Sequence, residues 1–313
     1  MNVIEIKDLT RDYGSGRGIF DVNFSVRRGE CFGFLGPNGA GKTTTLRHLM
    51  GFINPRSGIC TVNGMDCRKD SAKIQSFLGY IPGETAFIDS MSGMEFIKFL
   101  SAYRGMHDLG KAPELIRRFD LDPHGKIRKM SKGMKQKIAI VCAFMHDPEV
   151  LILDEPTSGL DPLMQNRFID LIAEEKNRGK TILMSSHMFE EVERTCGRVG
   201  IIRSGHLVAV DEISALKESQ LKRYVVTFDN EKSAGRFASE GLMTDPPDGC
   251  RISVTVRNDL TGFLQLLAKY PVKDLSQINQ SLEEIFLQYY GEETPQNISV
   301  GTPEKAGKGG MEQ

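Results

Sequence analysis

The stretch CFGFLGPNGAGKTTTLRHLMG, residues 31–51, decides the fold of this chain. Residues 31–35 form a short apolar run that is typical of a buried strand. A glycine-rich loop separates this strand from a helical pattern that carries Leu46 and Leu49 and that Gly51 can terminate. The order of strand, loop and helix predicts one unit of an α/β fold.

The loop, residues 36–43, matches the phosphate-binding pattern G-x-x-x-x-G-K-[ST]. Glycines let successive backbone N–H groups converge on phosphate oxygens, and the helix that begins there adds the positive end of its dipole. Lys42 would reach the β- and γ-phosphates, and the Thr43 hydroxyl would bind Mg²⁺. The residues expected at the nucleotide are Gly36, Pro37, Asn38, Gly39, Ala40, Gly41, Lys42, Thr43 and Thr44.

A second chemical motif is LILDE, residues 151–155. An apolar strand ends there in Asp154 and Glu155, at the sheet edge where α/β proteins collect their ligands. Asp154 suits the Mg²⁺ shell, acting through a bound water. Glu155 suits a general base that orients and deprotonates an attacking water. The alternative is that both acids only cap the turn before Pro156.

Other segments define the sheets. Residues 150–153 and 181–185 are apolar without alternation, as in strands that helices cover on both faces, and 163–176 between them has helical spacing. This order predicts a parallel core. Residues 3–26 read as an N-terminal antiparallel β subdomain whose glycines, at 14–18, form a turn. They do not form a dinucleotide-binding loop, because no amphipathic helix follows them.

The pattern changes twice along the chain. Residues 85–145 are mostly helical and predict a lobe inserted into the α/β unit, which runs from 1 to about 217. Residues 222–290 predict a small accessory α+β domain. Its expected strands and helices are 224–228, 251–256, 231–240, 259–269 and 281–290. Residues 291–313 contain few apolar side chains, which predicts a disordered tail.

Length and composition restrict the class of protein. The 313 residues allow about two domains, and a formal net charge of -1 argues against a nucleic-acid partner. The longest apolar run, 138–145, is far shorter than the roughly 20 residues of a membrane-spanning helix. The first residues lack a signal-peptide pattern, so we expect a cytoplasmic protein. Six cysteines without a C-x-x-C pair are expected to be reduced thiols.

These motifs together resemble the ATP-binding subunit of ABC transporters over residues 1 to about 217. The matching motifs are Walker A at 36–43, Walker B at 151–155, the D-loop at 158–161, the switch histidine at 185–187 and the signature at 130–136. Tyr13 stands where the family has an aromatic residue that stacks on adenine. Ordered agreement at six places is more specific than any single motif.

The resemblance implies that two copies of the chain enclose two ATP molecules. Each ATP would lie between Walker A of one copy and Ser131 and Gly133 of the other. His187 would contact the γ-phosphate and hold the attacking water with Glu155. The catalytic residues would thus be Glu155, His187 and Lys42, with ATP and Mg²⁺ as the bound groups and Thr43 and Asp154 as the metal ligands.

Three segments, SKGMKQ at 131–136, GYIP at 79–82 and SLEEIFL at 281–287, are similar to the drug- and antibiotic-export branch of the family. The cassettes of this branch are encoded apart from their membrane subunits. The resemblance implies a transmembrane permease as partner and a location on the cytoplasmic face of the membrane. A groove beside Gly83 and the helical lobe would receive a helix of the permease. Phe87, Phe96 and Phe99 either line this groove or only fill the core of the lobe.

The sequence also departs from the family pattern. Lys132 replaces the first glycine of the signature, Met134 replaces its glutamine, and Gly83 stands where a glutamine is usual, with Glu84 beside it as a candidate substitute. Because of these departures, an alternative function is a nucleotide-gated binding module that hydrolyses little ATP. A soluble ABC ATPase of DNA repair or translation is a third reading, against which stand a single cassette and the absence of basic excess. The sequence decides neither the exported molecule nor whether the pair is a homodimer.

Overall fold

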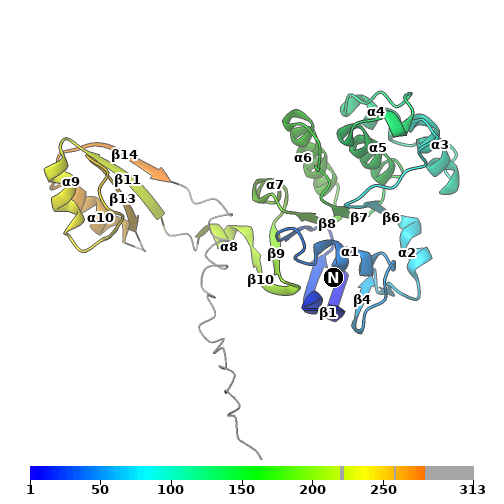
Figure 1. Ribbon diagram of the computed structural model, residues 1–313, viewed down its shortest axis with the longest axis horizontal. Coiled ribbons are helices and arrows are strands. Elements are labelled where there is room, and N and C mark those ends of the chain that lie inside the picture. Colours follow the sequence, from blue (N-terminus) through cyan, green and yellow to red (C-terminus); the bar gives the residue numbers. More distant parts are fainter. Residues whose placement is uncertain (219–221, 257–258, 279–313) are drawn as a thin grey trace, which may run out of the picture.

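The computed structural model describes residues 1–218, 222–256 and 259–278 (Figure 1). Its main element is a six-stranded sheet in the order β10-β9-β3-β8-β7-β6. The strands are β3 (Cys31–Leu35), β6 (Leu78–Ile81), β7 (Val150–Asp154), β8 (Thr181–Ser186), β9 (Arg198–Arg203) and β10 (His206–Glu212). All neighbouring pairs are parallel except β9 and β10, so the sheet is mixed, as predicted.

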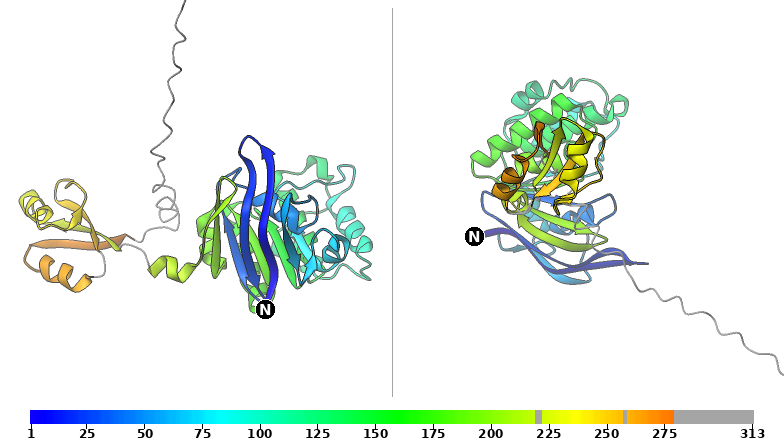
Figure 2. Two further views of the ribbon diagram at one scale, coloured as in Figure 1. Left: turned by 90° about the horizontal axis from the view of Figure 1, so that it is seen from below. Right: turned by 90° about the vertical axis from the view of Figure 1, so that its left-hand side faces the viewer.

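A second sheet is antiparallel and has the order β2-β1-β4-β5. Its strands are β1 (Asn2–Gly14), β2 (Arg17–Arg27), β4 (Ser57–Val62) and β5 (Met65–Asp66). Figure 2 shows β1 and β2 as one long hairpin beside the main sheet. The N-terminal antiparallel β subdomain predicted from the alternating pattern is therefore confirmed, and its turn lies at the predicted glycines.

The main sheet is buried on both faces. Alternate residues of a strand point to opposite faces, so Phe32 and Phe34 of β3 join one apolar cluster with α1, while Cys31 and Leu35 join another cluster with the helices of the far face. The helices that cover the sheet are α1 (Lys42–Leu49), α2 (Ser71–Phe77), α6 (Pro162–Asn177) and α7 (Phe189–Thr195), and α8 (Ile213–Glu218) follows β10. Burial on both sides explains the unbroken apolar runs.

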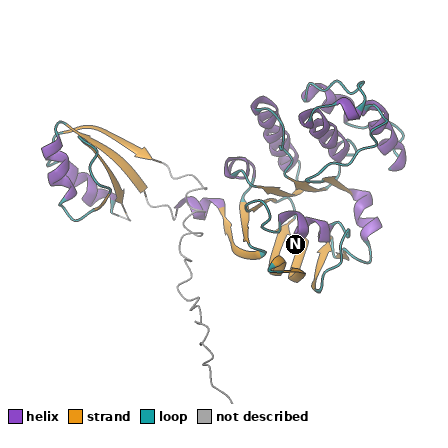
Figure 3. Cartoon of the chain, in the orientation of Figure 1, coloured by secondary structure: helices purple, strands orange, loops and turns teal. Residues whose placement is uncertain are grey.

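The inserted lobe is helical, as predicted. Its elements are α3 (Gly93–Tyr103), α4 (Ala112–Arg118), η1 (Ile127–Lys129) and α5 (Lys132–Phe144). Ser92 and Glu95 form a reciprocal capping box at the start of α3. Ser131 caps α5 by accepting a hydrogen bond from Met134 N at 3.2 Å. Figure 3 shows these helices as a group to one side of the strands of the main sheet.

The C-terminal residues form an α+β unit with its own apolar cluster. Its elements are β11 (Lys222–Phe228), α9 (Glu231–Ala238), β12 (Met243–Thr244), β13 (Arg251–Val256), α10 (Leu260–Leu267) and β14 (Val272–Ile278). The sheet is antiparallel in the order β12-β13-β11-β14. The predicted α/β fold class with a small α+β addition is confirmed. The helix expected at 281–290 and the tail at 291–313 lie outside the described residues.

Two further predictions concern residues that the structure describes. None of the described helices has the length and apolar character that crossing a bilayer requires. All six cysteines are free thiols, and only Cys250 is not fully buried.

Candidate active site

The phosphate loop (residues 36–43) joins β3 to α1 at the carboxyl end of the sheet. Glycine is required at two of its positions, because a Cβ on Gly36 would lie 2.4 Å from the Ile202 carbonyl and a Cβ on Gly41 would lie 2.7 Å from Ile19. Gly41 also has a φ of +113°, which L side chains rarely adopt. The loop therefore holds its backbone close to the entrance of α1, where N–H groups are free to bind an anion.

Lys42 folds back over this loop. Its ammonium donates hydrogen bonds to the carbonyl of Gly36 at 2.6 Å and to the carbonyl of Pro37 at 3.2 Å. Its side chain is only 4% exposed, and its Nζ lies 3.3 Å from Oε1 of Glu155. The loop thus presents a nearly buried positive charge directly beside the predicted general base.

Glu155 connects the phosphate loop to the switch histidine. Its second oxygen, Oε2, lies 3.4 Å from Nδ1 of His187. The backbone holds the residue at this point, because Glu155 N donates to the carbonyl of Ser185 at 3.1 Å and Glu155 itself has a φ of 47°. A positive φ is unusual for a glutamate and is a feature of sites whose surroundings determine the backbone. The three predicted catalytic residues therefore form one continuous group.

Asp154 has the surroundings expected of a residue that binds a cation. The side chain is fully buried, and the Ser185 hydroxyl donates a hydrogen bond to Oδ1. Its other oxygen, Oδ2, has no hydrogen-bond partner among the described residues. A Cβ on Gly83 would lie 2.8 Å from this Oδ2 and 3.6 Å from Oγ1 of Thr43. An unsatisfied buried carboxylate oxygen and a hydroxyl thus face one small space, and this donor set fits Mg²⁺.

A cavity of about 510 Å³ opens over Lys42, Thr43 and Glu155, whereas Asp154 and His187 do not line it. The residues that line it are Tyr13, Arg17, Gly18, Pro37, Asn38, Gly39, Gly41, Lys42, Thr43, Thr44, Arg47, Gly83, Glu84, Lys132, Glu155 and Ser158. Tyr13 is half exposed at its rim, with the Arg11 guanidinium 5.3 Å from its ring centroid. Gly36 and Ala40 do not line the cavity, because they pack against each other and Ile202 beneath the loop.

Several residues of this lining belong to none of the motifs in the sequence. Arg17 and Arg47 bring two positive charges to the cavity, from β2 and α1. Both are typical surface residues in the sequence, and no motif marks them. A signal existed for Ser158, because it opens the D-loop, although we assigned it no contact with the nucleotide.

The signature residues lie beside this cavity but are not grouped with the phosphate loop. Neither Ser131 nor Gly133 lines it. Gly133 packs so closely that a Cβ there would lie 2.7 Å from the Gly159 carbonyl. Lys132, between them, reaches the cavity and donates a hydrogen bond to the Ser158 hydroxyl at 2.8 Å. The start of α5 is therefore tied to the D-loop of its own chain.

Known proteins similar to this chain agree on one family. A family model described as ABC transporter matches residues 19–158. An uncharacterized ABC transporter ATP-binding protein of Bacillus subtilis is 29% identical over 304 residues, covering 93% of this chain and 96% of that protein. The bacitracin transport ATP-binding protein of Bacillus licheniformis is 37% identical over 225 residues, covering 70% of this chain and 73% of that protein. A solved structure described as the ATP-binding subunit of an ABC transporter superimposes with a TM-score of 0.64 at 32% identity, covering 69% of this chain and 92% of that one.

Proposed function

The chain belongs to the ABC transporter family of ATP-binding proteins, and from this premise we propose that it is the ATP-hydrolysing subunit of a drug or antibiotic exporter. The observation that carries the proposal is the continuous group of Lys42, Glu155 and His187 at the phosphate loop. A relative named for bacitracin transport supports export of such compounds.

ATP would lie in the cavity with its phosphates on the loop of residues 36–43. The backbone N–H groups at the start of α1 and the Lys42 ammonium would bind phosphate oxygens, while Tyr13 would stack on the adenine. Glu155 would orient the attacking water and take its proton, and His187 would hold the water and the γ-phosphate from the other side. Catalysis would then consist of positioning and charge stabilisation.

Mg²⁺ would be held by the Thr43 hydroxyl and, through a water, by Asp154. No group of three or more His, Cys, Asp or Glu that could hold a metal occurs in the described part of the chain. Mg²⁺ usually takes one or two protein ligands and completes its shell with phosphate oxygens and water. When bound, the ion neutralises charge on the β- and γ-phosphates.

We propose that two cassettes pair, with Ser131 and Gly133 of one copy facing the nucleotide of the other. Both residues lie outside the cavity of their own chain, at the N-terminus of α5, where backbone N–H groups can bind a phosphate from a second molecule. Tight binding of ATP and weaker binding of ADP would then shift the pair between closed and open states.

The partner that receives this motion would be a separate transmembrane permease, so that the chain lies on the cytoplasmic face of the membrane. Phe87 and Phe96 pack partly against the core of the lobe, with their ring centroids 5.0 Å apart. Phe99 and Tyr103 extend this row to the surface, and Tyr103 is 82% exposed. Exposed aromatic side chains in a row are suited to an interface. We expect no nucleic-acid partner.

The domain organisation is proposed on the same basis. Residues 1–217 would be the motor, and 222–290 an accessory domain that supports regulation or pairing. Deletion of the chain after Leu216 should then weaken ATP-dependent dimerisation or change the ATPase rate, while nucleotide binding persists. Unaltered dimerisation and rate would count against an accessory role.

The central test measures ATP hydrolysis by the full chain reconstituted in lipid vesicles with its permease. We expect turnover that the permease stimulates, and a chain that binds no nucleotide would refute the proposal. Phe99→Glu should weaken co-purification with the permease without changing ATP affinity. Ile59→Glu, at an apolar residue of β4 that is 54% exposed against 43% for Phe99, is the matched control.

A second candidate function is a nucleotide-gated binding module with little hydrolysis. The observation that favours it concerns Lys132, which stands where the family pattern has a glycine. Its ammonium lies in the wall of the cavity and donates a hydrogen bond to the Ser158 hydroxyl. ATP-induced dimerisation without permease-stimulated turnover would support this candidate. If Lys132 is the cause of the low turnover, Lys132→Gly should raise it.

A further inference from the structure

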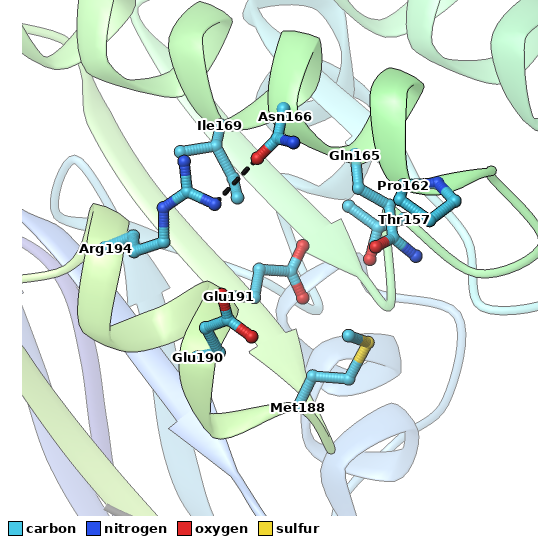
Figure 4. A pocket seen from close by; sticks show the side chains of 9 residues that line it. All are labelled: Thr157, Pro162, Gln165, Asn166, Ile169, Met188, Glu190, Glu191 and Arg194. Carbon is cyan, nitrogen blue, oxygen red and sulfur yellow. Dashed lines mark hydrogen bonds between the residues drawn. The ribbon is translucent and has the colours of Figure 1, made fainter. Parts of the chain in front are cut away.

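A second cavity, of about 160 Å³, lies beside the catalytic residues, between α6 and α7 (Figure 4). The residues that line it are Thr157, Pro162, Gln165, Asn166, Ile169, Met188, Glu190, Glu191 and Arg194. Arg194 donates a hydrogen bond to Oδ1 of Asn166 at 2.7 Å and so links α7 to α6 across the cavity. The ATP site described above shares none of these lining residues.

Glu191 is the unusual member of this lining. Only 4% of the residue is exposed, and Figure 4 shows its carboxyl group in the midst of the other lining side chains. Oε2 accepts a hydrogen bond from the Ser186 hydroxyl at 2.7 Å, but Oε1 has no partner among the described residues. Burial raises the pKa of Glu191, while the hydrogen bond from Ser186 acts in the opposite direction.

A carboxyl group in this state costs stability. A buried polar atom without a hydrogen bond destabilises the folded chain, and an apolar side chain of similar volume would fill the space without that penalty. Packing alone therefore does not explain a glutamate at position 191, whereas its hydrogen bond with Ser186 gives the carboxylate a role.

That hydrogen bond acts on the residues around the switch histidine. The Ser186 hydroxyl donates to Glu191 at 2.7 Å, with the Met188 carbonyl as a more distant acceptor at 3.3 Å, and its oxygen accepts a hydrogen bond from Met188 N at 2.9 Å. His187 lies between Ser186 and Met188 in the chain. Because the His187 side chain is 46% exposed, packing does little to orient it, and its direction depends on the backbone on either side.

We propose that Glu191 is a positioning residue for ATP hydrolysis, which holds Ser186 and the backbone of residues 186–188 so that the His187 imidazole reaches Glu155. The inference rests on the proposed function. Thr157, two residues beyond Glu155, lines the same cavity, so the Glu191 carboxyl lies between the segment that carries the base and the segment that carries the histidine. A shift of about 1 Å at a reacting group can cost roughly 100-fold in rate.

The test is a double-mutant cycle on the full chain with its permease, with kcat and the ATP dissociation constant measured for each variant. Glu191→Ala should lower kcat by roughly 10- to 100-fold and leave ATP affinity within about threefold. Ser186→Ala should give a similar loss. In a chain that already carries His187→Ala, adding Glu191→Ala should change kcat by less than about twofold, because the residue acts through the histidine.

Two further variants separate positioning from general stability. Glu191→Gln keeps an oxygen that can accept the Ser186 proton, so it should restore most of the rate. Glu190→Ala removes an exposed neighbouring carboxylate and should behave as the wild type. The positioning role would be overturned if the fold-losses in kcat of Glu191→Ala and His187→Ala multiplied in the double variant, or if Glu191→Ala kept the full kcat. In both cases turnover by the wild type would still support the proposed function. A wild-type chain that binds ATP but never hydrolyses it would overturn both.

Discussion

The ammonium of Lys42 lies 3.3 Å from Oε1 of Glu155, so the group that would bind the γ-phosphate is paired with the group that would activate water. Opposite charges at this distance attract strongly when one of them is nearly buried. A bound phosphate would compete with the carboxylate for the same ammonium. We therefore expect binding of the triphosphate to free the Glu155 carboxylate from Lys42, so that it can orient the attacking water. ATP binding would in this way prepare the general base for hydrolysis.

Replacing Glu155 by glutamine should separate these two functions. Glu155→Gln removes the negative charge and the base but keeps the shape of the side chain, so ATP binding should persist while kcat falls by about 100-fold or more. Equilibrium binding of a fluorescent ATP analogue and phosphate release measure the two effects. Glu174→Gln, at an exposed carboxylate of α6, is the control. Turnover close to that of the wild type would exclude Glu155 as the base.

Replacing Lys42 should affect binding itself. Charge-assisted hydrogen bonds to an ionised group contribute about 1.5–3 kcal/mol, so Lys42→Ala should weaken ATP binding by roughly 10- to 100-fold. Titration calorimetry measures this directly. Lys73→Ala removes an exposed lysine of α2 and should leave the affinity unchanged. Equal affinities of the two variants would mean that the phosphates lie elsewhere.

Adding one carbon atom at position 83 should impair the metal site. A Cβ there would lie 2.8 Å from Oδ2 of Asp154, in the space that faces Thr43. Gly83→Ala should therefore raise the Mg²⁺ concentration needed for half-maximal hydrolysis by about tenfold, a loss of about 1.4 kcal/mol. Binding of nucleotide without the metal should change little.

Gly197→Ala is the matched control for this prediction, because a Cβ at Gly197 meets no atom within 4 Å. A Gly83→Ala chain with the Mg²⁺ dependence of Gly197→Ala would show that the space beside Asp154 is not the metal site.

The stability of the chain should fall as the medium becomes acidic, through His146. Burial lowers the pKa of His146 to about 4, whereas an unfolded histidine titrates near 6.5. Between these values the unfolded chain binds more protons than the folded chain, so the free energy of unfolding decreases as the pH falls from 6.5 toward 4. Because the ring is partly exposed, we expect about 1–2 kcal/mol from this residue.

Urea unfolding at pH 7 and pH 5 can isolate this contribution. His146→Gln has no titrating group at the position, so its unfolding free energy should drop less between the two pH values than that of the wild type. An equal drop in both proteins would assign the acid sensitivity to other groups.

Much of the fold followed from local patterns. The unbroken apolar run of β3, the glycines at 36 and 41 and the helical spacing of α1 each express a requirement of one short segment, and a sequence displays such requirements directly. The same holds for Ser131, which caps α5 as its residue type suggests. Strands β9 and β10 were not predicted, because their pairing depends on partners far along the chain.

The phosphate loop and the acids at 154 and 155 could therefore be predicted from the sequence alone, because each depends on the residue types and backbone conformation of one short segment. Tertiary structure decided which of them meet. The register of β7 against β8 sets Asp154 opposite Ser185, and the turn after β6 brings Gly83 against the same carboxylate. It also brought Glu191 into one cavity with Thr157, and Arg17 to the cavity above the phosphate loop. Contacts between distant segments depend on sheet order and packing, which no local period encodes.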